Sequence, residues 1–283
     1  MRARRTAFFL LPLLAVACST PVGVQRVPPR EVHRALTSNV LSTGEPSATA
    51  IQSLHRLDLF ELHARDPDAG LRAVREKMLS ETDRRELLYA LAELEFHRAE
   101  QVRGKRARLH FLAASIYAYE FMRNMLSSEL LVAVDPSFRV AADLYNRGLT
   151  SGLASEDGET VDLSPRVLEL PFGELVLESG QHELSWGGYR MVDFVPVAEL
   201  EVRGLRNRYR TPGIGAPLAA SLEPAALDDP PPGAGHISRI VRVPATAVVI
   251  VDGALEGNGP LVVRGRLELF TIDDATTAPV GES

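Results

Sequence analysis

The spacing of apolar residues changes once along this chain, near Glu156-Asp157-Gly158, and this change constrains the fold more than any other feature. Before it, apolar side chains recur every three or four residues, as on one face of a helix. One such run is Leu87, Leu91 and Leu94. After it, apolar residues alternate with polar ones, as in strands with one buried face. We therefore predict an α+β protein, with an α-helical array over residues 30–155 and a mainly β module over residues 159–275.

Capping signals divide the helical region into segments. Ser47, Asp66-Pro67 and Asp135-Pro136 each place a side-chain oxygen just before a predicted helix. Such an oxygen can accept a hydrogen bond from the first helical turn, and proline is favoured at the first helical position. For the helix between them, we expect Ser80 or Thr82 to be the cap.

Helical hairpins are expected in the middle of this region. Gly104 lies in a turn short enough to join two antiparallel helices. The segments 88–94 (LYALAEL) and 114–119 (ASIYAY) are similar to tetratricopeptide (TPR) hairpins, although no period of about 34 residues repeats. The array is therefore predicted to be TPR-like. Four residues could line a ligand groove or pack in the helix–helix core, and their helical spacing favours the core. They are Tyr117, Tyr119, Phe121 and Met122.

The N-terminus has the layout of an export signal. Three arginines within residues 2–5 precede an uncharged, mainly apolar run, residues 6–17, which is shorter than the about 20 residues of a membrane-spanning helix. Residues 14–19 (LAVACS) resemble a lipobox, the motif in which the cysteine becomes the lipidated first residue. We predict a lipoprotein signal peptide over residues 1–17, lipidation of Cys18 and a tether over residues 18–29. The alternative is an ordinary signal peptide with an incidental cysteine.

This anchor predicts location and limits partners. Membrane lipid attached through Cys18 would hold the chain in the cell envelope. An aspartate directly after the cysteine would resemble the signal for retention in the inner membrane. The residue there is Ser19, so the outer membrane is favoured if the host is Gram-negative. Cys18 is the only cysteine, so no internal disulfide is possible. Removal of residues 1–17 takes away three arginines and changes the formal charge from −6 to −9. Such a charge disfavours nucleic acid or anionic lipid as a general partner.

Alternation and turn residues outline the β module. Strands are expected at Glu174–Glu178, Met191–Val195, Val197–Val202, Ile240–Val251 and Leu261–Phe270. Turns are expected at residues 186–188 and 257–260, and the second of these is predicted to join two strands as a hairpin. Residues 222–235, rich in proline, alanine and aspartate, are predicted to be an exposed loop, and residues 276–283 a tail.

Familiar catalytic patterns are missing from the sequence. No Gly-x-Ser-x-Gly motif, phosphate-binding loop or dinucleotide motif occurs, and the seven histidines are scattered. We therefore assign no catalytic residue, no metal site and no cofactor, and expect this chain alone not to be an enzyme. Glu93 and His97 share a helix face, and we interpret them as a surface pair.

The densest unusual segment is 202–218 (VRGLRNRYRTPGIGAPL). Alternating arginines in an extended chain point the same way, so they could bind a phosphate or carboxylate group. They could equally pair with carboxylates of the chain and lock the packing of domains, which is the interpretation that we favour. The candidate residues are Arg203, Arg206, Arg208, Tyr209 and Arg210.

Five stretches carry a family resemblance: 143–148 (DLYNRG), 170–173 (LPFG), 187–194 (GGYRMVDF), 203–217 (RGLRNRYRTPGIGAP) and 267–276 (LELFTIDDAT). Their order resembles the N-terminal, non-catalytic region of bacterial, often lipid-anchored, α/β-hydrolase-like proteins. In longer members a catalytic α/β-hydrolase domain follows. Here the sequence ends at Ser283, and no residue matches the nucleophile, acid or histidine of that domain.

The resemblance implies a membrane-anchored lipoprotein that acts as the accessory half of an α/β-hydrolase-like protein, with a hydrolase domain or another protein as its partner. One alternative is a free-standing envelope lipoprotein that binds a ligand or serves as a scaffold. A third, weaker hypothesis is an esterase with an unrecognised site, which the missing nucleophile motif disfavours.

Overall fold

A computed structural model describes most of the chain. It covers residues 26–127, 135–180, 185–186, 188–200, 213–225, 242–253, 255, 257 and 259–271. Within these residues, eight helices precede seven strands of one sheet, so the predicted α+β class is confirmed. The predicted site residues lie outside the described residues: Cys18, Arg203, Arg206, Arg208, Tyr209 and Arg210.

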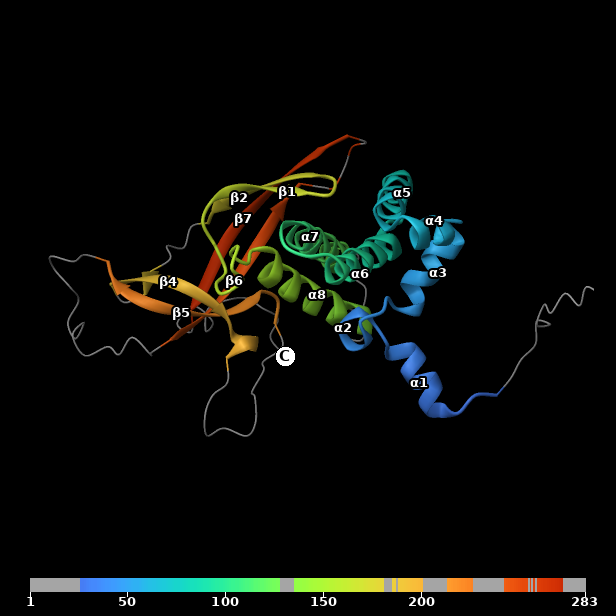
Figure 1. Ribbon diagram of the computed structural model, residues 1–283, viewed down its shortest axis with the longest axis horizontal. Helices are drawn as coiled ribbons and strands as arrows, with labels where there is room; N and C mark the ends of the chain where they lie inside the picture. The colour runs from blue at the N-terminus through green and yellow to red at the C-terminus, as the bar shows by residue number, and fades with distance from the viewer. Residues whose placement is uncertain are drawn as a thin grey trace, which may run out of the picture.

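The helices lie at one end of the molecule and the sheet at the other (Figure 1). They are α1 (Pro29–Thr37), α2 (Val40–Thr43), α3 (Ala48–Arg56), α4 (Phe60–Arg65), α5 (Pro67–Ser80), α6 (Arg85–Gln101), α7 (Lys105–Ser127) and α8 (Pro136–Gly152). Helices α6, α7 and α8 are the central ones, since α6 packs on α7 and α7 on α8. Helix α1 projects away from the rest and has no buried residue (Figure 1).

Three of the predicted caps are confirmed. The side chains of Ser47, Asp66 and Asp135 accept hydrogen bonds from the first turns of α3, α5 and α8. The prediction for the helix between them is wrong, because α6 begins only at Arg85 and its N-cap, Arg84, makes no capping bond. Instead of Ser80 or Thr82, the carboxylate of Asp83 accepts a hydrogen bond from the backbone N–H of Arg85, at 3.2 Å.

Small residues let α8 approach α7 closely. A Cβ atom on Gly148 would lie 2.7 Å from the carbonyl oxygen of Phe111, and one on Gly152 would lie 2.6 Å from Cγ of Leu112. Real Cβ contacts are longer, so these two positions fix the distance between the helices. The expected helix–helix core is also present, with Tyr117, Phe121 and Met122 buried and Tyr119 partly buried.

The sheet is mixed and curled like half of a barrel (Figure 1). Its strands are β1 (Arg166–Leu170), β2 (Gly173–Ser179), β3 (Ser185–Trp186), β4 (Tyr189–Pro196), β5 (Ala216–Pro224), β6 (Val243–Asp252) and β7 (Leu261–Thr271). The spatial order is β1-β2-β7-β6-β5-β4-β3. Only β2 and β7 pair in parallel, and the other neighbours are antiparallel. The predicted hairpin over 257–260 is confirmed by the antiparallel pair β6–β7.

The prediction of a strand over Val197–Val202 is wrong for its described residues, because Val197–Glu199 form a short 3-10 helix, η2. Pairing of β4 with β5 ends at Pro196 opposite Leu218, and the backbone turns into η2 directly after it. Strand β5 itself was not expected, since its span overlaps the arginine-rich segment 202–218 and the predicted loop 222–235. It contains three alanines and two prolines, a composition with low strand propensity, and neighbouring strands on both sides impose its conformation.

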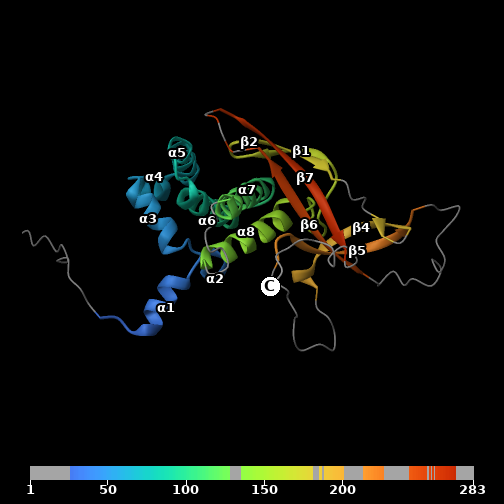
Figure 2. The same ribbon diagram turned by 180° about the vertical axis from the view of Figure 1, so that it is seen from behind.

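A β-bulge adds to the curl. The register of β4 against β5 shifts between Val192 and Val195, and Asp193 has a positive φ of 49°. Bulges bend a strand and increase its twist. The curled sheet turns one face toward α7 and α8, as the view from behind also shows (Figure 2). Alternate residues of β6 are buried on that face, from Val243 to Val251.

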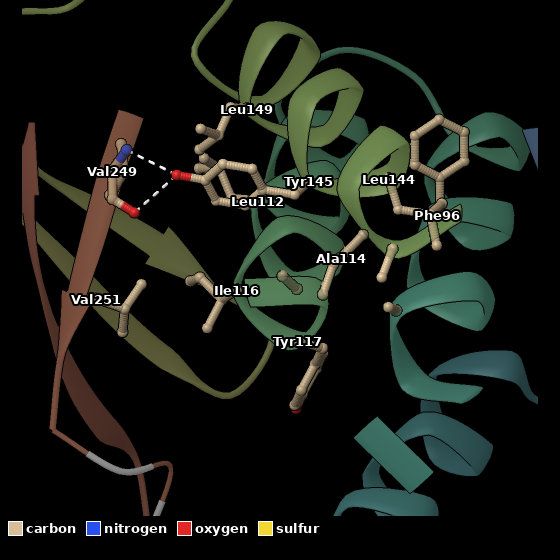
Figure 3. Packing of buried hydrophobic residues seen from close by; sticks show 14 of the residues in the cluster. Phe96, Leu112, Ala114, Ile116, Tyr117, Leu144, Tyr145, Leu149, Val249 and Val251 are labelled. Carbon is tan, nitrogen blue, oxygen red and sulfur yellow. Dashed lines mark hydrogen bonds between the residues drawn. The ribbon is translucent and has the colours of Figure 1, made fainter. Parts of the chain in front are cut away.

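A single hydrophobic core joins the helices to the sheet. Its buried residues run from Val40 in α2 through α6, α7 and α8 to Leu269 in β7. Figure 3 shows the part of this core where Ile116 of α7 and Tyr145 of α8 meet β6. Among the described helices, none is long and apolar enough to cross a membrane.

Candidate functional site

The most chemically distinctive site is a cavity of about 220 Å³ between α5, α6, α7 and the turn that joins β1 to β2; we refer to it as the helical cavity. Helix α5 presents one face to it, at positions i, i+3, i+4 and i+7. The lining residues are Asp68, Leu71, Arg72, Arg75, Glu95, Arg106, Leu109, His110, Tyr117, Pro171 and Phe172. Exposed Arg72 and Arg106 lie at its rim, whereas Glu95 and Tyr117 are buried.

Asp68 is the most heavily bonded anion of the helical cavity. Its two carboxylate oxygens accept from Nε and Nη2 of Arg98, at 2.8 and 3.1 Å, and Oδ2 also accepts from Arg106 at 2.8 Å. The bonds from Arg98, together with the nearby positive charges, lower the pKa of the Asp68 carboxyl, although partial burial opposes the shift. Asp68 therefore remains charged and is fully occupied by two arginines.

A buried pair, Glu95 and His110, lies behind Asp68. The Oε2 atom of Glu95 lies 2.6 Å from Nδ1 of His110, and the other ring nitrogen lies 3.7 Å from Oδ1 of Asp68. Burial raises the pKa of Glu95, and the hydrogen bond with His110 opposes that shift. The pair holds the imidazole ring in one orientation between two carboxylates.

Two further arginines carry charge that no carboxylate offsets among the described residues. Arg72 and Arg75 form no ion pair there. The guanidinium carbon of Arg75 lies 5.3 Å from the ring centre of Phe172, and its Nη2 donates to the carbonyl of Gly257 at 3.3 Å. These contacts hold Arg75 in place without neutralising it.

The β1–β2 turn that closes the helical cavity depends on Gly173. Its φ is 150°, and a Cβ atom there would lie 2.0 Å from the carbonyl oxygen of Leu261, its partner in β7. Only glycine fits this contact, and it places Pro171 and Phe172 over the helices. The ring of Phe172 also lies 5.1 Å from that of Tyr117.

The lining of the helical cavity supports binding. Its described residues include arginines, carboxylates and a histidine, together with apolar side chains, but no serine, threonine, cysteine or lysine. A nucleophilic mechanism of the serine or cysteine type thus has no nucleophile at this wall. Positive charge beside an apolar, partly aromatic surface is suited to an organic anion.

A second cavity, about 520 Å³, lies between α8, η2 and the start of β5; we refer to it as the sheet cavity. The side-chain amide of Asn146 bridges its wall. Its Nδ2 donates to the carbonyl of Gly213 at 2.8 Å, and its Oδ1 accepts the N–H of Gly215 at 2.6 Å. The lining residues Glu199 and Gly213 lie close in sequence to the arginine segment, whose own residues are outside the described ranges.

Gly215 is required at this contact. Its φ is 126°, and a Cβ atom would lie 2.4 Å from Cγ2 of Thr246. One residue before Asn146, the hydroxyl of Tyr145 bonds to the backbone of Val249 (Figure 3). Consecutive residues of α8 thus attach it to β6 and to the backbone just before β5. Tyr145 and Asn146 belong to the stretch 143–148, and Gly213 and Gly215 belong to the stretch 203–217; the sequence did not predict that these two stretches meet.

The helical cavity was missed in the sequence, although signals for it exist. Asp68, Arg72 and Arg75 share one face of α5, and Glu95 lies between the apolar residues Leu94 and Phe96 of α6. Glu93 was interpreted wrongly as part of a surface pair with His97. It is fully buried, and its carboxylate accepts from the N–H groups of Val40 and Ser47 and from the Ser47 hydroxyl. His97 instead contacts the carbonyl of Gly44.

In the part of the chain that the structure describes, no three His, Cys, Asp or Glu side chains are grouped so that they could hold a metal ion. Comparison of the chain with protein-family models, with characterised proteins and with solved structures finds no significant match.

Proposed function

We propose that this protein is a lipoprotein of the bacterial cell envelope, held by lipid on Cys18, that acts as the non-catalytic accessory half of an α/β-hydrolase-like protein. In a Gram-negative host its place would be the outer membrane. Its partner would be a hydrolase domain or a separate hydrolase, and the chain would position and support that partner. The helical hairpins would act as a TPR-like array beside the sheet.

The observation that carries this proposal is the structural use of the stretches that resemble the family. The 143–148 stretch provides Tyr145 and Asn146, which attach α8 to the sheet, and the 203–217 stretch provides Gly213 and Gly215 as the acceptor and donor for Asn146. The 170–173 stretch forms the β1–β2 turn over α5 and α7. Motifs that build one rigid contact between two halves are expected of a supporting unit.

Helix α1 supports the membrane location. It has no buried residue, and it begins a short distance after Cys18. Arg30 and Arg34 share one side, whereas Val32 and Leu36, which are 40% and 80% exposed, share the other. A helix with a basic side and an apolar side fits the surface of a membrane.

The helical cavity favours a second candidate, a free-standing envelope lipoprotein that binds a ligand. Both candidates share the anchor and differ in the partner, so one experiment can separate them. The native chain and its Cys18→Ser variant are expressed in the bacterial host, and the membranes are solubilised in mild detergent. Lipid on Cys18 is measured by the mass of the N-terminal peptide, and serine hydrolases are labelled with a fluorophosphonate probe.

We expect lipid on the native chain only, and a labelled hydrolase that co-purifies with the native chain. A lipidated chain without a labelled partner would refute the accessory role and favour the second candidate, a free-standing lipoprotein that binds a ligand. Probe reacting with this chain itself would indicate the esterase. An unmodified native Cys18 would refute the anchor.

A further inference from the structure

The charge balance of the helical cavity points to a ligand class. Three arginines and two carboxylates line it, and the fourth arginine nearby, Arg98, bonds to Asp68 from outside the lining. Asp68 is occupied by Arg98 and Arg106, and Glu95 by His110. The charges of Arg72 and Arg75 therefore remain to attract an anion. This local excess occurs in a protein whose formal net charge is −6, so it is not a general property of the surface.

Arg75 is held ready for such a contact. Phe172 lies under its guanidinium and the Gly257 carbonyl accepts from one of its nitrogens, so the side chain loses little freedom when a ligand arrives. Arg72 lies three residues earlier on the same face of α5 and is exposed. Two guanidinium groups so placed can share one carboxylate through parallel N–H···O bonds.

The rest of the helical cavity suits an apolar body of small size. Leu71, Leu109, Pro171 and Phe172 supply apolar surface, and Tyr117 supplies an aromatic ring. A volume of about 220 Å³ has room for about seven water molecules at roughly 30 Å³ each. That is below the about 300 Å³ at which sites for drug-sized molecules begin. A single ring or a short branched chain with one charged group fits this space.

We propose that the helical cavity binds a small organic carboxylate, with Arg72 and Arg75 holding the carboxylate group and Phe172, Leu71 and Leu109 enclosing a compact apolar body. This inference goes beyond the accessory role, since it needs neither the anchor nor a hydrolase partner. Asp68 and the Glu95–His110 pair form the opposite wall, where Arg98 and Arg106 are already engaged by Asp68, so a second negative group finds no free cation there. A dicarboxylate is therefore a poor ligand.

The test uses the purified mature chain with Cys18→Ser and four probes in isothermal titration calorimetry. They are phenylacetate, its neutral isostere phenylacetamide, phenylsuccinate and phenyl phosphate. We expect phenylacetate to bind with a Kd below about 1 mM, and phenylacetamide and phenylsuccinate to bind at least tenfold more weakly. Equal binding of phenylacetamide, or no binding of phenylacetate, would overturn the proposal. Tighter binding of phenyl phosphate would overturn the assignment to carboxylates.

Two variants locate the site. Arg72→Gln removes one guanidinium at an exposed position, so the fold is expected to persist, and it should weaken phenylacetate binding at least tenfold. Arg65→Gln changes an exposed arginine at the end of α4, outside the cavity lining, and should leave binding unchanged. Thermal unfolding of both variants checks the fold. Equal effects of the two substitutions, or normal binding by Arg72→Gln, would show that the helical cavity is not the site.

Discussion

The hydroxyl group of Tyr145 makes two hydrogen bonds to one residue, Val249, at 2.8 Å each: it accepts the N–H and donates to the carbonyl oxygen (Figure 3). Pairing of β5 with β6 ends at Ala216 opposite Ala247, so β5 no longer covers this edge of β6 at Val249. The tyrosine of α8 thus takes the place of a neighbouring strand. Burial raises the pKa of Tyr145 above its usual range, which keeps the hydroxyl protonated and able to donate.

Tyr145→Phe should destabilise the fold substantially. It leaves the N–H and carbonyl of the buried Val249 without a partner, and each unsatisfied buried group costs about 1–3 kcal/mol. We expect the free energy of unfolding in urea to fall by about 2–4 kcal/mol. Tyr189→Phe is the matched control, because its buried hydroxyl has no hydrogen-bond partner among the described residues, and its loss should change stability by less than about 0.5 kcal/mol. Similar losses in both variants would refute this role of Tyr145.

The sequence was sufficient for features set by local chemistry. Caps at Ser47, Asp66 and Asp135 depend on a side chain and the backbone just beyond it, and all three were predicted. The close approach of another helix at the small residues of α8, and four of the expected strands, were predicted for a similar reason. The spacing of residues along one element reveals its buried face.

Features set by distant residues were not predicted. Glu93 was taken for a surface residue because nothing near it in the sequence shows that the backbone of Val40 and Ser47 surrounds its carboxylate. Strand β5 has weak intrinsic preference and exists because β4 and β6 pair with it. The helical cavity combines three helices with a turn from the sheet, so its charge balance is visible only in three dimensions.

Ser47→Ala should destabilise the protein in a pH-dependent way. Burial raises the pKa of Glu93 above its value in the unfolded chain, and hydrogen bonds from Ser47 and Val40 limit that shift. At pH values between the pKa of Glu93 in the unfolded chain and its pKa in the folded protein, the folded state binds more protons than the unfolded state. The free energy of unfolding therefore decreases as the pH rises through that window. Without the Ser47 hydroxyl the pKa of Glu93 rises further and the window widens.

We therefore expect Ser47→Ala to lower the free energy of unfolding by about 2 kcal/mol near neutral pH, from a lost cap and a less satisfied carboxylate, and by less near pH 5. Urea titrations at several pH values measure the difference. Ser80→Ala, which removes an exposed hydroxyl bonded to the Lys77 carbonyl, should have little effect at any pH. A loss for Ser47→Ala that does not change with pH would show that Glu93 does not titrate as argued.

Leu36→Asp should weaken contact with membranes. In the unlipidated mature chain (Cys18→Ser), binding to vesicles that contain anionic lipid should fall about tenfold, because an exposed leucine of α1 no longer enters the interface and about 1.5 kcal/mol of apolar burial is lost. Sedimentation with vesicles at low salt measures this. Leu126→Asp changes another exposed leucine, at the end of α7, and serves as the control. If both variants bind as the parent chain does, α1 does not lie on the membrane.

Gly173→Ala should disrupt the pairing of β2 with β7. Gly173 and Gly104 both have positive φ values, 150° and 61°, so alanine is strained at either position. At Gly104 nothing lies within 4 Å of the added Cβ atom, whereas at Gly173 that atom would lie 2.0 Å from the carbonyl oxygen of Leu261 and 2.5 Å from its nitrogen. Backbone atoms in a paired strand cannot move aside without breaking the β2–β7 ladder.

Gly104→Ala is therefore expected to cost about 1 kcal/mol, the strain of a left-handed conformation alone. Gly173→Ala should cost more than about 3 kcal/mol, because the strain is joined by the loss of strand pairing. Thermal unfolding followed by circular dichroism compares the two. The β1–β2 turn carries Phe172, so the same substitution should also abolish phenylacetate binding, whereas Gly104→Ala should preserve it. If both alanine variants were equally stable, the contact between Gly173 and Leu261 would not control the position of this turn.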